Sequence, residues 1–186
     1  MGDYAITLLD EHKSGSSKLT PTFDELFNDH HEKVLKAAFR VTGNLDDAED
    51  VLQSVFLRLL KRSERPDFGN NPAGYLCRSA INAGLDLLRS KGRTKAESFD
   101  EESYPANSGA ADADVRQTEQ RTHLRRALLS LDQHGAEVFA LRFYEDFSNA
   151  EIAQLLDTSS NSIAVTLHRA RARLQQILGE LEGEDR

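Results

Sequence analysis

The sequence contains no tryptophan and, among 186 residues, only one cysteine, one methionine and four prolines. A single cysteine excludes a disulfide framework within the chain and is typical of a reducing compartment. No apolar run approaches the ~18 residues of a membrane span, and residues 1–20 lack the basic start and apolar centre of a secretory signal. We therefore expect a protein without membrane insertion that works in the cytoplasm.

Motifs of enzymes and metal proteins are also missing. The six histidines lack the cysteine or carboxylate spacing of a metal site, and there is no glycine-rich phosphate loop or nucleophile motif. The acids of residues 46–50 fit a helix start better than an acid–base pair. Cys77 has no base beside it, so we expect it to pack within a helix. The expectation is no cofactor, no metal and no catalytic activity.

Hydrophobic residues make up 39% of the chain, charged residues 29% and aromatics 7%, which favours a helical rather than a sheet protein. The net charge of −8 is unevenly distributed. Residues 96–115 carry six acids and no Lys or Arg, whereas residues 75–95 carry five bases against one acid. Residues 158–179 contain no acid at all. Such sorting of charge predicts separate surfaces with different partners.

The stretch ESFDEESYPANSGAADADV has almost no large apolar side chains. It cannot bury enough surface to offset the entropy of ordering, and it therefore reads as a flexible acidic linker. We expect an all-α chain of two small helical domains, each with a modest core of its own. The predicted boundaries are an N-terminal extension at 1–21, a helical domain at 22–93, the linker at 94–117 and a second domain at 118–186.

Three helices are predicted in the first domain. The first, Phe23–Val41, ends at Gly43; the second follows Asn44 as N-cap and reaches Arg62; the third runs from Pro72 to Arg89. Apolar residues at i, i+3 and i+4 spacing predict the buried positions. On the first two helices these are Leu26, Phe27, Val34, Ala37, Ala38, Ala48, Val51, Leu52, Val55, Phe56, Leu59 and Leu60.

Four shorter helices are predicted in the second domain, over 118–131, 135–144, 149–156 and 160–178. Ser148 and Glu151 have the spacing of a capping box. In the last helix Ile163, Leu167, Ala170 and Leu174 form an apolar stripe. A short helix, the tight connection DTSS and a longer basic helix together predict a helix-turn-helix.

The last helix has the chemistry of a DNA-reading element. Its first turn carries Ser160, Asn161 and Ser162, whose side chains can hydrogen-bond to base edges in the major groove. Thr166, Arg169 and Arg173 lie on one further stripe, where arginines can meet phosphates. An acid here would repel the DNA backbone. The alternative is an amphipathic helix whose solvated face is rich in arginine, which the helix alone leaves open.

The rest of the chain resembles a known family. ALLSLDQHGAEVFALRFYEDFSNAEIAQLLDTSSNSIAVTLHRARARLQQIL resembles the promoter-binding C-terminal domain of bacterial extracytoplasmic-function sigma factors. Independently, DDAEDVLQSVFLRLLK and NPAGYLCRSAINAGLDLLRSKGR resemble the N-terminal domain of the same sigma-70 family. The two matches occur in the family's order and cover nearly all of residues 22–180.

The resemblance implies a promoter-specificity subunit of RNA polymerase. Within the second domain, relatives often carry basic or polar residues at the positions of Ala164, Val165 and Thr166, where they face the minus-thirty-five element. The resemblance therefore leaves fewer readers of that element here. They are Ser160, Asn161, Ser162, Thr166, Arg169, Arg171 and Arg173. In the first domain, the residues implied to dock on the coiled coil of the polymerase's largest subunit are Asp47, Asp50, Gln53 and Ser54. Composition alone favours a solvated helix face there.

The loop and third helix of the first domain are implied to hold the opened minus-ten strand. Unstacked bases need aromatic faces, amides and a basic groove. The residues that offer these are Lys61, Arg62, Arg65, Phe68, Asn70, Asn71, Tyr75, Arg78, Asn82 and Arg89. For Phe68 and Tyr75, plain core packing is an equally good interpretation.

Further partners follow from the resemblance alone: the flap of the polymerase's second-largest subunit, and an anti-sigma factor that no residue here identifies. The acidic linker fits either the polymerase channel that later carries RNA or a simple spacer. A competing hypothesis is a stand-alone regulator that binds duplex DNA through the helix-turn-helix. Such a regulator needs a ligand pocket, phosphoacceptor or dimer surface, whereas this first domain carries a basic loop and helix rich in aromatic and amide groups.

Overall fold

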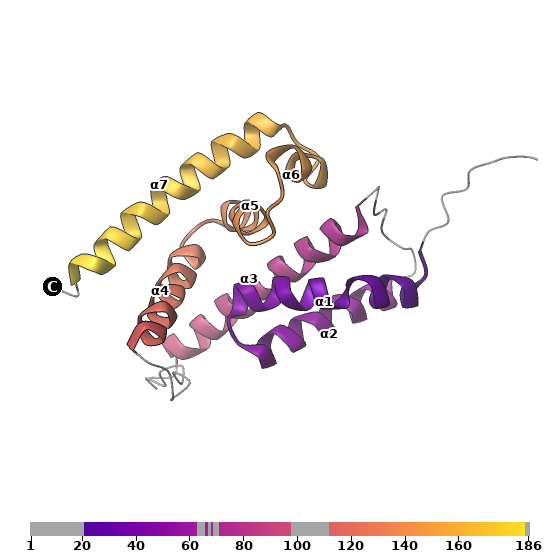
Figure 1. Cartoon of the computed structure of the whole chain (residues 1–186), viewed down its shortest axis with the longest axis horizontal. Coiled ribbons are helices and arrows are strands. Elements are labelled where there is room, and N and C mark those ends of the chain that lie inside the picture. The colour runs from indigo at the N-terminus through magenta and orange to yellow at the C-terminus, as the bar shows by residue number, and fades with distance from the viewer. Residues whose placement is uncertain (1–20, 63–65, 67, 69–70, 98–111, 185–186) are drawn as a thin grey trace, which may run out of the picture.

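The computed structural model describes residues 21–62, 66, 68, 71–97 and 112–184, and these residues form seven α-helices and no strand (Figure 1). The predicted all-α class is confirmed. The N-terminal extension and most of the acidic linker, at 98–111, lie outside the described residues.

The first three helices form a bundle. They are α1 (Phe23–Thr42), α2 (Leu45–Lys61) and α3 (Pro72–Glu97), and each contacts the other two. A capping box starts α1, Gly43 ends it with a left-handed φ of 67°, and the Asn44 side chain caps α2. The bundle's core holds large side chains with almost no exposed surface, including Leu26, Leu76 and Ile81.

Two predicted core positions of this bundle were wrong. Phe27 is 37% exposed and Leu60 is 60% exposed. Each lies at the edge of the apolar stripe of its own helix, and the neighbouring helices do not cover the full width of that stripe. Leu60 faces solvent because Val55, Phe56 and Leu59 already fill the contact of α2 with α1 and α3.

The other four helices form the C-terminal half. They are α4 (Asp112–Leu129), α5 (Gln133–Phe143), α6 (Asn149–Leu155) and α7 (Ser160–Glu184), and α7 packs on all three of the others. Two elements extend into the predicted linker, since α3 continues to Glu97 and α4 begins at Asp112. The residues SKGRTKAE after Leu88–Arg89 are mostly good helix formers, so one glycine does not end α3.

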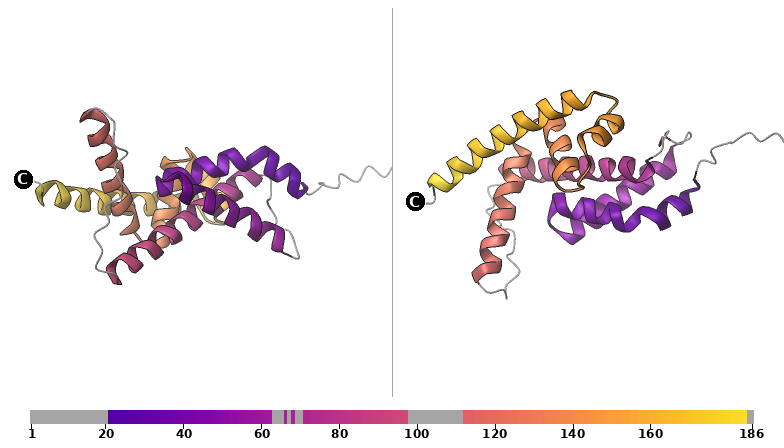
Figure 2. Two further views of the ribbon diagram at one scale, coloured as in Figure 1. Left: turned by 90° about the horizontal axis from the view of Figure 1, so that it is seen from below. Right: turned by 45° about the horizontal axis from the view of Figure 1, so that its top comes forward.

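The two halves are in contact. Helix α5 packs across α3, and α4 lies near the C-terminal end of α3, so that α5 sits between α3 and α7 (Figures 1 and 2). The buried apolar side chains of both halves form one contiguous cluster, which differs from the expectation of separate cores. Helix α3 joins the two halves, because it packs on α1 and α2 on the one hand and on α5 on the other, and its Arg78 and Asn82 also bond to Glu137 of α5.

Candidate polymerase and promoter interfaces

Helices α6 and α7 form the predicted helix-turn-helix. The reciprocal bonds between Ser148 and Glu151 start α6 and lower the pKa of the Glu151 carboxyl, as a capping box should. Asp157 makes the turn with a left-handed φ of 49°, and the Thr158 amide donates to the Ala153 carbonyl at 2.9 Å. The Ser159 hydroxyl then accepts from the Ser162 amide at 3.1 Å, which caps α7.

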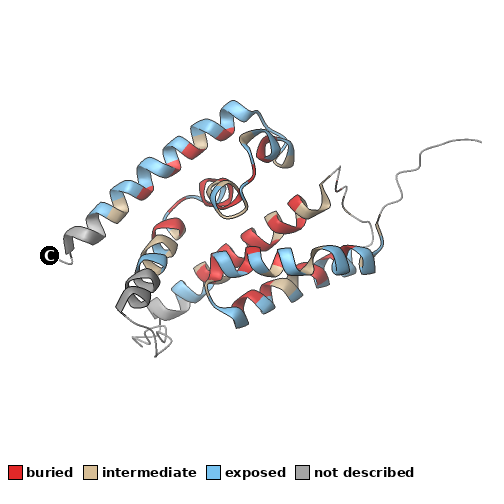
Figure 3. Ribbon diagram, in the orientation of Figure 1, coloured by how far each residue is buried: buried red, intermediate tan, exposed pale blue. Residues whose placement is uncertain are grey.

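Helix α7 has two clearly different faces. The predicted stripe of Ile163, Leu167, Ala170 and Leu174 is buried, with exposed fractions of 0–4%. The remaining surface is mostly exposed and turned away from the rest of the molecule (Figure 3). The polar residues of the first turn, Ser160, Asn161 and Ser162, are all exposed, and Thr166 is half-buried. The side chains of the first turn are therefore accessible to a partner as large as a DNA duplex.

The three arginines of α7 are exposed, and none pairs with a carboxylate of the described residues. The Arg171 guanidinium lies 4.9 Å from the centre of the Phe143 ring, and Arg173 donates to the Gln176 side chain at 2.9 Å. Arg169 makes no such contact within the described part of the chain. Their positive charge is thus available on the surface.

A shallow groove on α2 brings together three of the four predicted polymerase-docking residues. Asp50, Gln53 and Ser54 line it together with Leu57, Arg58 and Lys61. Leu57 is 50% exposed and was not among the predicted docking residues, although an apolar side chain one turn beyond Gln53 was the available signal. Asp47 lies elsewhere: it is buried, and its carboxylate accepts from the Lys91 amine of α3 at 2.5 Å.

The residues predicted to meet the minus-ten strand divide into two groups. Near the start of α3, the Phe68 ring is buried edge-on against Tyr75 at 5.2 Å, and Arg62 donates to the Tyr75 hydroxyl at 3.1 Å. Lys61 is exposed and Asn71 caps the first turn of α3, where its side chain accepts from the Gly74 amide. Arg65 and Asn70 lie outside the described residues.

The second group, further along α3, faces the C-terminal half. Arg78 Nε and Asn82 Nδ2 both donate to the same carboxylate oxygen of Glu137 on α5, each at 2.7 Å. Arg89 donates to the Leu131 carbonyl at 3.3 Å. Glu137 is only 5% exposed. Glu137 was not among the predicted site residues. The available signal was a single acid directly before the apolar run VFAL, because a charge buried among apolar residues needs a partner.

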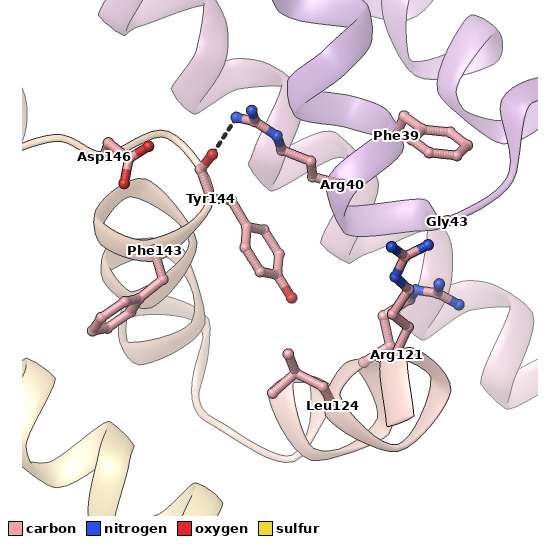
Figure 4. Close-up of a pocket in the computed structure, with 9 residues that line it drawn as sticks. Phe39, Arg40, Gly43, Arg121, Leu124, Phe143, Tyr144 and Asp146 are labelled. Carbon is pink, nitrogen blue, oxygen red and sulfur yellow. Dashed lines mark hydrogen bonds between the residues drawn. The ribbon is translucent and has the colours of Figure 1, made fainter. Parts of the chain in front are cut away.

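A second contact joins α1 to the turn after α5. Arg40 donates to the Tyr144 carbonyl (Figure 4). It also donates to the Glu145 carboxylate at 3.0 Å. Burial nevertheless raises the pKa of the Glu145 carboxyl above its ordinary value, and Arg40 offsets this only in part. Beside this contact is an open cavity of about 540 Å³, with Phe39, Gly43 and Leu124 among its lining residues.

Comparison with known proteins agrees with this geometry. A family model described as Sigma-70 region 2 matches residues 26–94, and one described as Sigma-70, region 4 matches residues 121–174. The chain is 32% identical to the RNA polymerase sigma factor CarQ of Myxococcus xanthus, over 87% of this chain and 92% of CarQ. The chain belongs to the extracytoplasmic-function group of the sigma-70 family. It is a sigma factor that directs transcription initiation.

Other sigma factors extend the comparison. The chain is 28% identical to the sigma factor SigE of Mycolicibacterium smegmatis, over 92% of this chain and 67% of SigE. A solved structure of the sigma factor RpoE in complex with the anti-sigma factor NepR, from Bartonella quintana, is 22% identical and has a TM-score of 0.51. It covers 84% of this chain and 96% of its own, and shows a common fold. No helix in the described residues of this sigma factor is long and apolar enough to cross a membrane.

Proposed function

We propose that this sigma factor acts in the cytoplasm, performs no chemistry of its own, and places each promoter contact on a different helix. In this proposal the α2 groove binds core RNA polymerase, α3 and the loop before it bind the minus-ten element, and α7 binds the minus-thirty-five element. The names of the relatives, which are RNA polymerase sigma factors, support polymerase as the partner. The flap of the second-largest polymerase subunit is the proposed partner of the C-terminal half.

The assignment of α7 rests on one observation above all. Its first turn exposes Ser160, Asn161 and Ser162 while the buried stripe fixes the helix against α4, α5 and α6. A helix held rigidly with a polar first turn can enter a major groove and read base edges. Arg169, Arg171 and Arg173 follow it, and we assign them to the phosphates.

The minus-ten assignment rests on the chemistry of α3. Tyr75 offers an aromatic face, Asn82 an amide, and Arg78 and Arg89 positive charge, which are the kinds of group that hold an opened strand. Polymerase docking rests on the α2 groove, where exposed Leu57 adds an apolar contact beside the polar Asp50 and Gln53. An anti-sigma factor is a further proposed partner, supported by the complex in which the related structure was solved.

The test is transcription in vitro with core polymerase on a genomic library, which identifies the start sites and hence the promoter elements. On the promoter so found, Asn161→Ala should relax sequence preference at one minus-thirty-five position, at a cost of about 1–3 kcal/mol for that base. Arg173→Gln should weaken binding on all sequences and reduce its salt dependence. Lys36→Gln is the matched control, because it removes one positive charge from an exposed site on α1.

Two results would contradict the proposal. One is a pulldown in which the chain does not retain core polymerase while the protein alone protects duplex promoter DNA. The other is an equal effect of Lys36→Gln and Arg173→Gln on promoter binding, since the contribution of α7 would then be net charge alone.

A further inference from the structure

The cavity beside Tyr144 lies where three helices meet. The end of α1, one face of α4 and the end of α5 with the turn after it form its wall. Its volume of about 540 Å³ falls within the range of sites that hold small organic molecules, about 300–1,000 Å³. Among the described residues, none of those that we assign to polymerase or to the promoter lines it. The cavity is therefore a candidate for a role that the promoter contacts do not explain.

The wall of this cavity is rich in positive charge. Three arginines line it against a single acid, Asp146. Arg40 of α1 is already paired with Glu145. Arg121 of α4, by contrast, is exposed and makes no hydrogen bond or ion pair within the described residues. Figure 4 shows Asp146 at the edge of the cavity opposite α4. The α4 side of the cavity therefore carries an excess of positive charge that attracts an anion.

The third arginine, Arg125, reaches the cavity across Gly43. Its guanidinium lies so close to Gly43 that a Cβ added at residue 43 would collide with it. The glycine thus ends α1 with its left-handed φ of 67° and also leaves room for the guanidinium. Arg121 and Arg125 are four residues apart on α4, so both project from the same face of that helix. Two guanidinium groups therefore lie on one side of the cavity.

The Tyr144 hydroxyl is a second group without an explanation in the fold. Figure 4 shows the Tyr144 ring pointing into the cavity toward Leu124. Burial raises the pKa of this hydroxyl above its ordinary value, and the charge of Arg125 offsets the shift only in part. The hydroxyl nevertheless makes no hydrogen bond within the described part of the chain. A largely buried hydroxyl normally has a partner, so this one indicates where a ligand atom belongs.

We propose that this cavity binds a small phosphorylated molecule with a planar ring, of the class of the nucleoside diphosphates. Arg121 and Arg125 hold phosphate oxygens, because a guanidinium matches phosphate in charge and in hydrogen bonding. The Tyr144 hydroxyl donates to an oxygen of the same ligand. The planar ring stacks on Phe39, which lines the cavity and is 45% exposed.

The experiment is calorimetric titration of the full-length protein without polymerase or DNA. The probes are the diphosphates of adenosine, guanosine, cytidine and uridine, compared with inorganic pyrophosphate and with the four parent nucleosides. At least one nucleoside diphosphate should bind with one site per chain. It should bind about tenfold more tightly than pyrophosphate and than its own nucleoside, because each of these lacks one of the two kinds of contact.

Three arginine variants and one tyrosine variant locate the site. Arg121→Gln should weaken binding about tenfold, since it removes a charge-assisted bond to phosphate. Tyr144→Phe keeps the ring, removes the hydroxyl and should weaken binding about fivefold. Arg126→Gln is the matched control, because it removes the same charge from an exposed position of α4 outside the cavity. Arg173→Gln tests the basic surface of α7. Neither of these last two should change the affinity.

Thermal denaturation separates a lost ligand contact from a lost fold. Arg121 is exposed and has no partner in the described residues, so Arg121→Gln should melt at the wild-type temperature while it binds the ligand less tightly. A lowered melting temperature that accounts for the lost affinity would overturn the assignment of Arg121 to the ligand.

Four binding results would overturn the proposal. The first is that none of the four diphosphates binds. The second is equal weakening by Arg121→Gln and Arg126→Gln, since net charge alone would then attract the anion. The third is loss of binding in Arg173→Gln, which would place the ligand on α7. The fourth is pyrophosphate that binds as tightly as the best diphosphate, because the ring would then contribute nothing. None of these results bears on the promoter assignments, which involve other residues.

Discussion

Among the side chains discussed above, Cys77 has the pKa that departs furthest from its ordinary value. Burial, together with the neighbouring Glu145 carboxylate, raises the pKa of its thiol from 9.0 to about 12. The thiolate is the species that reacts, so the native protein near neutral pH holds about a thousandfold less of it than an ordinary thiol would. The cysteine is therefore a structural residue of the folded chain.

We expect a disulfide reagent at pH 8 to modify the native protein about a thousandfold more slowly than the protein in concentrated urea. The measurement is the release of the coloured thiol under both conditions, with free cysteine as the reference for the effect of urea on the reagent. Equal rates in the two states would show that the thiol is already accessible in the folded protein.

Asp157 is the residue with the least favourable backbone in the helix-turn-helix. Its left-handed φ of 49° is costly for a side chain with a Cβ and free of that cost for glycine. We expect Asp157→Gly to raise the free energy of unfolding by about 0.5 kcal/mol, the relief of strain exceeding the extra entropy of the unfolded chain. Asp157→Ala, which keeps the Cβ, should not stabilise. The measurement is urea denaturation of the wild type and the two variants. Equal midpoints for Asp157→Gly and Asp157→Ala would show that backbone strain at residue 157 does not determine the stability difference.

At the scale of the helices, α7 combines a buried stripe that fixes it with an exposed face that we assign to DNA. Ile163 is fully buried, while Val165, two residues further on, is 42% exposed. We expect Ile163→Ala to cost about 2–4 kcal/mol of unfolding free energy, since it leaves a cavity under the first turn. Val165→Ala should cost less than about 0.5 kcal/mol. Similar losses from both, in thermal or urea denaturation, would mean that the helix is packed in another orientation.

These elements were predictable because their signals are local. Helix caps such as Asn44 and Ser148, the glycine after α1 and the stripe of α7 all depend on residues within a few positions of one another. The misplaced residues, Phe27 and Leu60, belong to helix faces whose burial depends on how far the neighbouring helix reaches. That reach is a tertiary property, so periodicity alone could not exclude them from the core.

The site residues, too, could be predicted only where the signal lies within a few positions of the sequence. Exposure of the first turn of α7 follows from the sequence, because the position of the apolar stripe fixes the opposite face. The pairing of Arg78 and Asn82 with Glu137 joins residues 55 and 59 positions apart, and no local pattern encodes it. For Asp47, the helix start gave the correct element, but its side chain turns toward Lys91 and away from the α2 groove.

At the scale of the whole molecule, the two halves are held together partly by groups that are expensive to bury. Glu145 is the clearest case, because its carboxyl keeps a raised pKa in spite of its bond to Arg40. The groups acting on it are Arg40 and Lys33 of α1, Asp146 beside it and the Cys77 thiol of α3. Burial therefore outweighs the attraction of the two cations.

Because the pKa of the Glu145 carboxyl is raised in the folded state, the direction in which its contribution to stability changes with pH is fixed. The folded protein binds the proton more tightly than the unfolded chain, so the contribution of Glu145 is fully present below the ordinary pKa of 4.5 and is lost as the pH rises through the raised value. Glu145→Gln imitates the protonated form. We expect it to be more stable than the wild type at pH 7, and this advantage should disappear as the pH falls below 4.5.

Glu151 provides a control, because its pKa is shifted in the opposite direction. Its pKa is lowered by the bonds to Ser148, so its contribution is present at neutral pH and is lost as the pH falls through the lowered value. Glu151→Gln should therefore be less stable than the wild type at pH 7, with the gap closing in acid. Melting temperatures of the three proteins from pH 3 to pH 8 give both comparisons. Should Glu145→Gln melt below the wild type at pH 7, the ion pair with Arg40 would outweigh burial, and the contact between the halves would be stabilised by the charge of Glu145.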